Sequence, residues 1–243
     1  MKKKAFFSWS GGKDSALALY YALQNSEYHV AKLVTNVTAG QRKIAVHGVR
    51  KTMLQAQALQ TGLPLQQMVM PSNPTMPVYD VAMTQTLAGL RAEGFATGIY
   101  GDIFLQDLRN FRQQALAKEG LTAAFPLWQK EPLLLMEQFI ILGFKAIVVC
   151  VNGSMLPQNF LGRIIDQQFL DDLPQGVDVC GENGEYHSYV FDGPLFIKPI
   201  AFTFGNITCR WLTAPLPPQQ PIGSNETVAA GKIPFWYQDI LPA

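Results

Sequence analysis

Through the first 150 residues, short apolar runs alternate with longer segments whose apolar positions recur with a helical period. The runs predict buried β-strands over residues 5–9, 31–37, 67–70, 96–100, 123–127 and 145–151. The periodic segments predict helices over residues 15–24, 49–60, 78–93, 105–118 and 133–142. Strands that alternate with helices in this way are typical of parallel βαβ units with right-handed crossovers, so we expect an α/β fold for this part of the chain.

The pattern changes after about residue 152. Residues 160–173 are predicted to form a helix, and residues 200–212 a hairpin that turns at Gly205 and Asn206. A proline-rich connector covers residues 214–223, and the apolar residues 233–243 are expected to dock on the body of the protein or on a second subunit. We therefore expect two domains, residues 1–130 and a smaller C-terminal α+β domain of residues 131–243, with a homodimer as one possible assembly.

Composition narrows the class of protein. Hydrophobic residues make up 48% of the chain, which is enough for a folded core, and charged residues only 15%. The formal net charge is +1, so no overall field is available to hold a long nucleic acid, and we expect none as a partner. The three cysteines form no closely spaced pair, which argues against a disulfide framework or a zinc ribbon and fits a reducing compartment.

Two apolar stretches fall short of what a membrane-directed segment requires. The lysines at positions 2–4 precede only three apolar residues, too few for the apolar region of a secretory signal. Residues 132–151 are interrupted by Glu137, Gln138 and Lys145 and do not read as a membrane span. We expect a cytoplasmic protein without membrane association.

The clearest chemical signal lies between the first predicted strand and the first predicted helix. This loop consists of Ser10, Gly11, Gly12, Lys13, Asp14 and Ser15 (SGGKDS). Two glycines allow a tight bend, while the free N–H groups and positive dipole end of the following helix attract an anion. Asp14 after Lys13 excludes a Walker A motif, and a plain glycine turn before a capped helix is the alternative. The combination favours a phosphate-binding loop.

The SGGKDS loop resembles the pyrophosphate loop of the N-type ATP pyrophosphatases, the adenine nucleotide alpha-hydrolase-like enzymes. Further segments are similar, in order, to the diphthine–ammonia ligase family: residues 101–103 (GDI), Arg109, Arg112, and residues 126–128 (PLW), 180–187 (CGENGEYH) and 192–196 (DGPLF). The resemblance covers roughly residues 4–200. It implies a Rossmann-like parallel sheet with helices on both faces. It also implies an enzyme that uses ATP and Mg²⁺ to adenylate a carboxylate, which ammonia then converts into an amide.

Several residues receive roles from this resemblance. Residues 10–15, Asn36 and His47 would bind ATP, with Lys13 also catalytic, although His47 is as readily a surface helix cap. Asp102, also predicted to be catalytic, follows a predicted parallel strand at its carboxyl end, where it could hold Mg²⁺ or cap the next helix.

Arg109 and Arg112 share a helix face and would form a fork for phosphate or for a substrate carboxylate. The alternative is a solvated face that pairs with Asp107.

Residues 182–187 (ENGEYH) carry the second chemical signal. If the chain is extended there, Glu185 and His187 point the same way and could orient an attacking amine or take its proton. The intervening glycine could bring Glu182 to the same place as a substrate-binding group, and the alternative is the polar face of an edge strand. We expect Cys180 to be a packing residue.

Two other functions compete with an amide ligase. One is a tRNA-modifying enzyme with the same loop, against which the scattered cysteines and the near-zero charge argue. The other is a non-catalytic ATP sensor whose apolar C-terminal end controls assembly. A ligase would need a small-molecule or protein-borne carboxylate and free ammonium or a partner's ammonia, because the chain carries no recognisable glutaminase segment.

Overall fold

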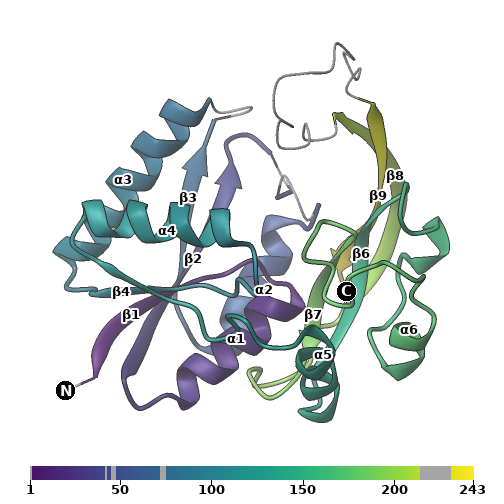
Figure 1. Ribbon diagram of the computed structural model, residues 1–243, viewed down its shortest axis with the longest axis horizontal. Helices are drawn as coiled ribbons and strands as arrows, with labels where there is room; N and C mark the ends of the chain where they lie inside the picture. Colours follow the sequence, from purple (N-terminus) through teal and green to yellow (C-terminus); the bar gives the residue numbers. More distant parts are fainter. Residues whose placement is uncertain (1, 42, 45–47, 72–74, 214–230) are drawn as a thin grey trace, which may run out of the picture.

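The computed structural model describes residues 2–41, 43–44, 48–71, 75–213 and 231–243. In this part of the chain, one parallel and one antiparallel β-sheet lie side by side (Figure 1). The predicted connector at residues 214–223 lies outside the described residues, and His47, which was predicted to bind ATP, is also outside them.

The first sheet is parallel, with the strand order β3-β2-β1-β4-β5. Its strands are β1 (Lys3–Ser8), β2 (Tyr28–Thr38), β3 (Leu65–Met70), β4 (Thr97–Ile99) and β5 (Thr122–Ala124). The connecting helices are α1 (Lys13–Gln24), α2 (Lys51–Thr61), α3 (Met76–Ala92) and α4 (Gln106–Lys118). The chain order reverses between β1 and β4, so the loops that follow these two strands open onto the crevice where such sheets bind ligands.

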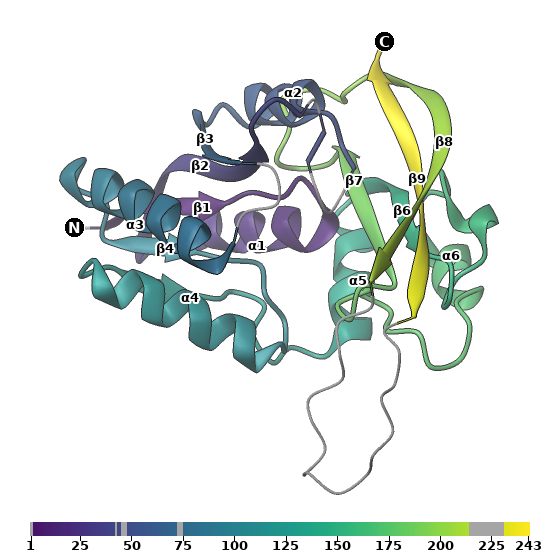
Figure 2. The ribbon, with the colours of Figure 1, turned by 90° about the horizontal axis from the view of Figure 1, so that it is seen from above.

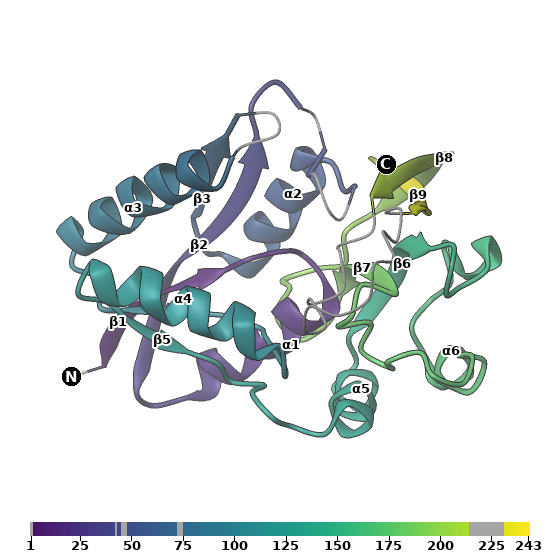
Figure 3. The same cartoon turned by 45° about the horizontal axis from the view of Figure 1, so that its top comes forward.

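Helices cover both faces of this sheet because successive residues of β1 point to opposite sides. Ala5 and Phe7 belong to the apolar cluster that includes α1 and α2, and Phe6 belongs to the one that includes α3 and α4. Figure 3 shows these two helix pairs around the sheet. The predicted Rossmann-like α/β architecture is confirmed.

The second sheet is antiparallel, with the strand order β7-β6-β9-β8. Its strands are β6 (Lys145–Asn152), β7 (Tyr186–Asp192), β8 (Phe202–Thr213) and β9 (Lys232–Pro242), and it is accompanied by α5 (Pro132–Ile141), a 3₁₀ turn (Gln158–Phe160) and α6 (Gln167–Asp171). The apolar end of the chain docks on the body as predicted, because it forms β9 between β6 and β8 (yellow in Figure 2).

Two predicted elements of this part are wrong. The helix expected over residues 160–173 is divided by Gly162, whose φ is +75°, and restarts at Asp166, whose carboxylate accepts a hydrogen bond from Phe169 N at 2.8 Å. The hairpin expected at Gly205 and Asn206 is an irregularity inside one continuous strand, since β8 pairs with β9 along its whole length.

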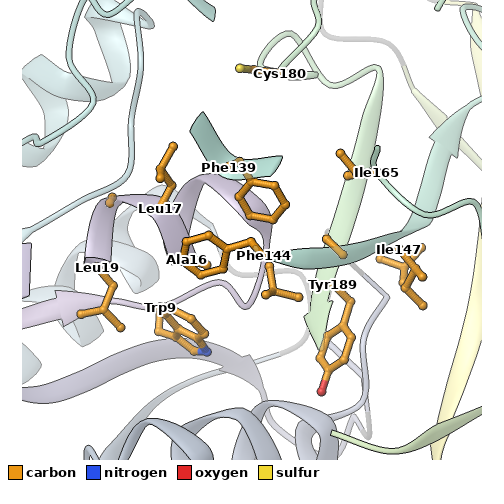
Figure 4. Packing of buried hydrophobic residues seen from close by; sticks show 14 of the residues in the cluster. Trp9, Ala16, Leu17, Leu19, Phe139, Phe144, Ile147, Ile165, Cys180 and Tyr189 are labelled. Atoms are coloured by element: carbon orange, nitrogen blue, oxygen red, sulfur yellow. The ribbon is translucent and has the colours of Figure 1, made fainter. Parts of the chain in front are cut away.

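One apolar cluster joins the two sheets. It combines side chains of β1 and α1 with those of α5, β6 and β7, including Trp9, Leu17, Phe139, Phe144 and Tyr189 (Figure 4). The second sheet therefore packs against the α1 and α2 side of the first, and the loop after β1 lies near β7. No helix in the described part of the chain is long and apolar enough to cross a membrane.

Candidate active site

The SGGKDS segment forms the bend between β1 and α1, as predicted. Gly12 caps the start of α1 without a side-chain hydrogen bond, and Lys13 is the first helical residue. The N–H of Gly12 points to Ser10 Oγ at 3.3 Å, and the N–H of Ser10 donates to Ser15 Oγ at 3.2 Å. The bend thus gathers backbone donors at the positive end of a helix, which suits an anionic ligand.

Gly11 is the residue on which this bend depends. Its φ is +81°, and an added Cβ would lie 2.5 Å from Gln57 Oε1 and from Leu54 Cδ2 of α2. Gln57 is fully buried, donates to Gly11 O at 2.9 Å and accepts from the Trp9 indole N–H at 3.1 Å. The buried amide of Gln57 therefore fixes the conformation of the loop from the α2 side.

The second sheet also fixes the loop. Ser188 Oγ of β7 accepts a hydrogen bond from Lys13 N at 3.1 Å, and Val190 N donates to Gly11 O at 3.0 Å. Gln57 donates to Val190 O at 2.7 Å, so the same side chain joins the loop and β7. The geometry of the bend consequently depends on both halves of the chain.

Lys13 places a buried positive charge at the N-terminus of α1. The side chain is 3% exposed, and its Nζ lies 2.7 Å from Asp14 Oδ2, donates to the carbonyl of Cys180 and lies 5.0 Å from the centre of the Tyr186 ring. Burial alone would lower the pKa of Lys13, but the Asp14 carboxylate together with Tyr186 and Cys180 outweighs that effect, and the pKa is raised. Lys13 is therefore charged at neutral pH.

Asp102 follows β4 across the crevice from the loop and is 7% exposed. Arg112 of α4 holds it from two sides, with Nε 2.7 Å from Oδ2 and Nη2 3.1 Å from Oδ1. The guanidinium also lies 4.4 Å from the centre of the Tyr100 ring. Burial raises the pKa of Asp102, although Arg112 opposes this. Gly101 allows the end of β4 to lie close to the backbone of Asp14, since a Cβ at Gly101 would lie 3.1 Å from Asp14 O.

Glu182 faces this group from the loop before β7. Its Oε1 accepts a hydrogen bond from Ile103 N at 3.3 Å. Burial, with the nearby carboxylates of Asp14 and Asp102, raises the pKa of Glu182 to about 7. Three carboxylates thus converge beside the helix terminus, and the Glu182 carboxyl can gain or lose a proton near neutral pH.

These residues surround a polar cavity of about 250 Å³. Its walls include Ser10, Gly12, Lys13, Asp14, Ser15, Asp102, Arg112, Glu182 and His187. An apolar cavity of about 520 Å³ adjoins it and is lined by Trp9, Asn36, Val37, Ile44, Met70 and Phe111, among others. Ser8, Ser10, Leu108 and Arg112 line both cavities. A polar compartment and an apolar compartment therefore meet at the end of β1.

The structure separates two residues that were predicted to act together. His187 lines the polar cavity, but Glu185 does not, because β7 begins at Tyr186 and Glu185 belongs to the preceding turn. Glu185 is 1% exposed, and its Oε1 accepts from Asp178 N and from the Asn183 amide, both at 3.2 Å. Glu185 thus supports the loop that carries Glu182, and the role of His187 stays a prediction.

The arginine fork is not formed. Arg112 points to Asp102, whereas Arg109 lies 4.3 Å from the centre of the Trp128 ring and does not line either cavity. The Cys180 thiol is 1% exposed and donates to Pro132 O at 3.5 Å, in agreement with its expected packing role.

Sequence reasoning missed Gln57, Ser188 and Tyr186. Gln57 interrupts no apolar pattern and adjoins no motif, and it becomes important only because α2 packs beneath the loop. Tyr186 belongs to the ENGEYH segment and Ser188 follows it, but their contacts with Lys13 span more than 170 residues of sequence. Local pattern carried no signal for these contacts.

Comparison with known proteins agrees with this geometry. The family model described as the diphthamide synthase N-terminal domain matches residues 1–121, and the one described as its C-terminal domain matches residues 131–214. The chain is 30% identical over 122 residues to a diphthine–ammonia ligase of Danio rerio, an alignment that covers 48% of each chain. It is 35% and 34% identical over 109 residues to those of Bos taurus and Homo sapiens, which covers 42% of this chain and 41% of each relative.

The alignments thus span less than half of the length of these relatives. Among solved structures, the U34-tRNA thiolase NcsA from Methanococcus maripaludis with its [4Fe-4S] cluster is 19% identical at a TM-score of 0.35, covering 58% of this chain and 57% of that one. A likeness of that size carries no argument. The two family models match successive parts of the chain and together cover most of it. The chain therefore belongs to the diphthamide synthase (diphthine–ammonia ligase) family.

Proposed function

We propose that this protein is an ATP-dependent amide ligase that forms AMP and pyrophosphate. Family membership supports ligase chemistry, and the site supports the ATP half of the reaction. The observation that carries the proposal is the buried Lys13 ammonium beside the helix terminus, in the wall of a polar cavity that adjoins an apolar one. A nucleoside triphosphate has the same division into a charged and a less polar end.

In this proposal, the β- and γ-phosphates lie against Gly11, Gly12 and Lys13, and the nucleoside lies in the apolar cavity beside Asn36. The substrate carboxylate oxygen attacks the α-phosphorus, the bond to the bridging oxygen breaks, and pyrophosphate leaves. Lys13 and the backbone N–H groups stabilise the charge that builds up on the leaving pyrophosphate, as fixed donors do in a preorganised site. Residues 1–130 would bind ATP and residues 131–243 the acyl substrate.

The carboxylates fit Mg²⁺ that arrives with the triphosphate. Besides burial, Asp14 raises the pKa of Asp102, and both raise the pKa of Glu182, so a cation here would relieve an excess of negative charge. No three Asp, Glu, His or Cys side chains in the described ranges form a ready metal site. Asp102, with phosphate oxygens, would hold the ion. When bound, Mg²⁺ would supply charge neutralisation on the phosphates.

Ammonia then attacks the acyl carbon, and AMP leaves with the electron pair of the broken bond. The amine must lose a proton, and Glu182 is the best placed acceptor because it lines the cavity with a pKa raised to about 7. His187 lines the same cavity and can share this role. The acceptor is a carboxylate on a small molecule or on a protein.

Phosphorus NMR of ATP, ammonium and candidate carboxylates tests this function. We expect AMP and pyrophosphate to form only when a carboxylate is present, and a carboxylate labelled with ¹⁸O to pass one label to AMP. The variant Lys13→Ala serves as the inactive control, and its melting temperature shows whether it folds. ADP as the product, or unlabelled AMP, would contradict adenylation.

A further inference from the structure

The C-terminal strand β9 contacts the nucleotide-binding half of the chain. This strand, Lys232–Pro242, lies beyond residue 214, where the match to the family's C-terminal model ends. Tyr237 and Asp239 stand two residues apart on β9 and therefore on the same face of the strand. Both contact described residues of the segment that connects β2 with α2.

Asp239 binds two residues of that segment at once, Lys43 and Arg50. The carboxylate is 8% exposed and accepts two hydrogen bonds from Arg50, from Nε at 3.0 Å and from Nη2 at 2.6 Å. Lys43 Nζ lies 3.0 Å from Asp239 Oδ1. Lys43 and Arg50 are also paired through an antiparallel β-bridge. One carboxylate thus neutralises two cations that the backbone places side by side.

Tyr237 contributes a second contact. Gly48 has a φ of +68°, and a Cβ there would lie 2.5 Å from the Tyr237 ring, so the backbone of Gly48 packs directly on this ring. Tyr237 is 4% exposed. Gly205 of β8 leaves room behind Asp239, since a Cβ there would lie 3.2 Å from Asp239 Cβ.

Two described residues beside these contacts line the apolar cavity. Ile44 lines the cavity and is 8% exposed, and its backbone is fixed by hydrogen bonds with Val49 O at 2.8 Å and Gly48 N at 3.0 Å. Thr38, which also lines the cavity, accepts a hydrogen bond through its carbonyl from Lys51 Nζ at 2.9 Å. The position of Ile44 therefore depends on residues that Asp239 holds.

We infer that Asp239 is a positioning residue for nucleotide binding, which acts from β9 through Lys43 and Arg50 on the nucleoside end of the site. This inference rests on the proposed function, because it assigns the apolar cavity to the nucleoside. It also predicts that Asp239 contributes to binding of the nucleoside and not to binding of the phosphates. Asp239 does not line the polar cavity, and the phosphate loop is fixed by other residues, Gln57 and Ser188.

Calorimetric titration with two probes tests this division. The probes are α,β-methylene-ATP and inorganic tripolyphosphate, which lacks the nucleoside. For Asp239→Asn we expect the dissociation constant of the ATP analogue to rise about three- to thirtyfold, the range for residues that act through others. Tripolyphosphate should bind as it does to the wild type. Asp239→Glu, which keeps the charge, should recover most of the affinity for the analogue.

Asp172→Asn is the matched control. It removes a carboxylate from an ion pair of similar length, 2.7 Å to Arg163, at the end of α6, and should leave both affinities unchanged. If Asp239→Asn does not fold, Arg50→Gln breaks the same pair from the other side and should give the same selective loss. Analogue affinity within twofold of the wild type, or an equal loss for both probes, would overturn the inference alone. A wild type that binds neither probe would overturn the proposed function as well.

Discussion

Gln57 donates a hydrogen bond to the carbonyl of Gly11 at 2.9 Å and a second one to Val190 at 2.7 Å, so a single buried amide joins the phosphate loop to the second sheet. The amide oxygen accepts the Trp9 indole N–H at 3.1 Å. All three hydrogen bonds lie within the apolar core that connects the two halves of the chain. The shape of the loop is therefore a property of the packed protein and not of the SGGKDS segment alone.

Replacing Gln57 with leucine should destabilise the protein. The substitution leaves the Trp9 donor without its buried acceptor and removes one donor each from the Gly11 and Val190 carbonyls, which should lower the free energy of unfolding by about 3 kcal/mol. Urea denaturation measures this loss. Gln113→Leu on the exposed face of α4 is the control and should change stability little. A loss equal to that of the control would show that the buried amide does not hold the loop.

Replacing Gly11 with alanine should lower the free energy of unfolding by more than the positive φ of this residue explains. Gly94 has a similar φ, +85° against +81°, but open space around it, so Gly94→Ala isolates the left-handed penalty of about 1 kcal/mol. Gly11→Ala adds a clash with Gln57 and Leu54 and should cost about 3 kcal/mol in all. It should also abolish binding of an ATP analogue, which Gly94→Ala leaves intact. Equal costs for the two variants would refute the close approach.

Arg112→Met should damage both stability and turnover. The variant leaves the carboxylate of Asp102 nearly buried without its counter-ion, for which we expect a loss of about 2 kcal/mol. Lys3→Met is the control, because it breaks an ion pair of 2.7 Å to Glu27 in which both side chains are about half exposed. That control should not change the denaturation midpoint measurably. Equal effects of the two variants would mean that Asp102 does not depend on Arg112.

The Glu182 carboxyl should make amide formation depend on pH. Because its pKa is raised to about 7, the carboxyl is protonated below that pH and can accept a proton above it. At a constant concentration of free NH₃, the rate should therefore rise through pH 7 in the wild type, and Glu182→Gln should lose this rise along with most of the rate. An unaltered pH profile in Glu182→Gln would assign the proton transfer to another group, with His187 the next candidate.

The same group should affect stability in the opposite sense. The folded-state pKa of Glu182 lies above the unfolded value of 4.5, so the folded protein binds more protons between about pH 4.5 and pH 7. The stability that this protonation provides is present below pH 4.5 and is lost as the pH rises through 7. Glu182→Gln should therefore raise the melting temperature at pH 8 more than at pH 4. A pH-independent difference would contradict the raised pKa.

Much of the α/β half could be predicted because its signals are local. A strand that is buried on both faces is a continuous apolar run, so β1 is evident in the sequence, and the glycines and lysine of the loop adjoin a strand and a helix. The run of β6 is equally evident, but it pairs antiparallel with β7 and β9 in the second sheet and does not continue the parallel series expected for it. The second half could not be read in this way. The partner of β8 is β9, which begins almost twenty residues further along the chain, and no local pattern of Gly205 and Asn206 reveals such a partner.

The candidate site shows the same division. Lys13, Asp102 and Glu182 were predicted from motifs, and the structure brings all three to one cavity. Glu185 and Arg109 were predicted with them, but the turn before β7 buries one and the Trp128 ring holds the other. The positions of Glu185 and Arg109 depend on tertiary packing, which cannot be predicted from the spacing of residues along the sequence.

The most direct test of the central claim is a crystal structure of the protein with α,β-methylene-ATP. We predict the β- and γ-phosphates at the N–H groups of Gly11, Gly12 and Lys13, the Lys13 ammonium on the phosphates, and the nucleoside in the apolar cavity beside Asn36 and Ile44. The α-phosphorus should face the open side of the polar cavity, near Asp102 and Glu182. An analogue bound elsewhere, with the N–H groups of Gly12 and Lys13 still donating to Ser10 Oγ and Ser188 Oγ, would contradict the account.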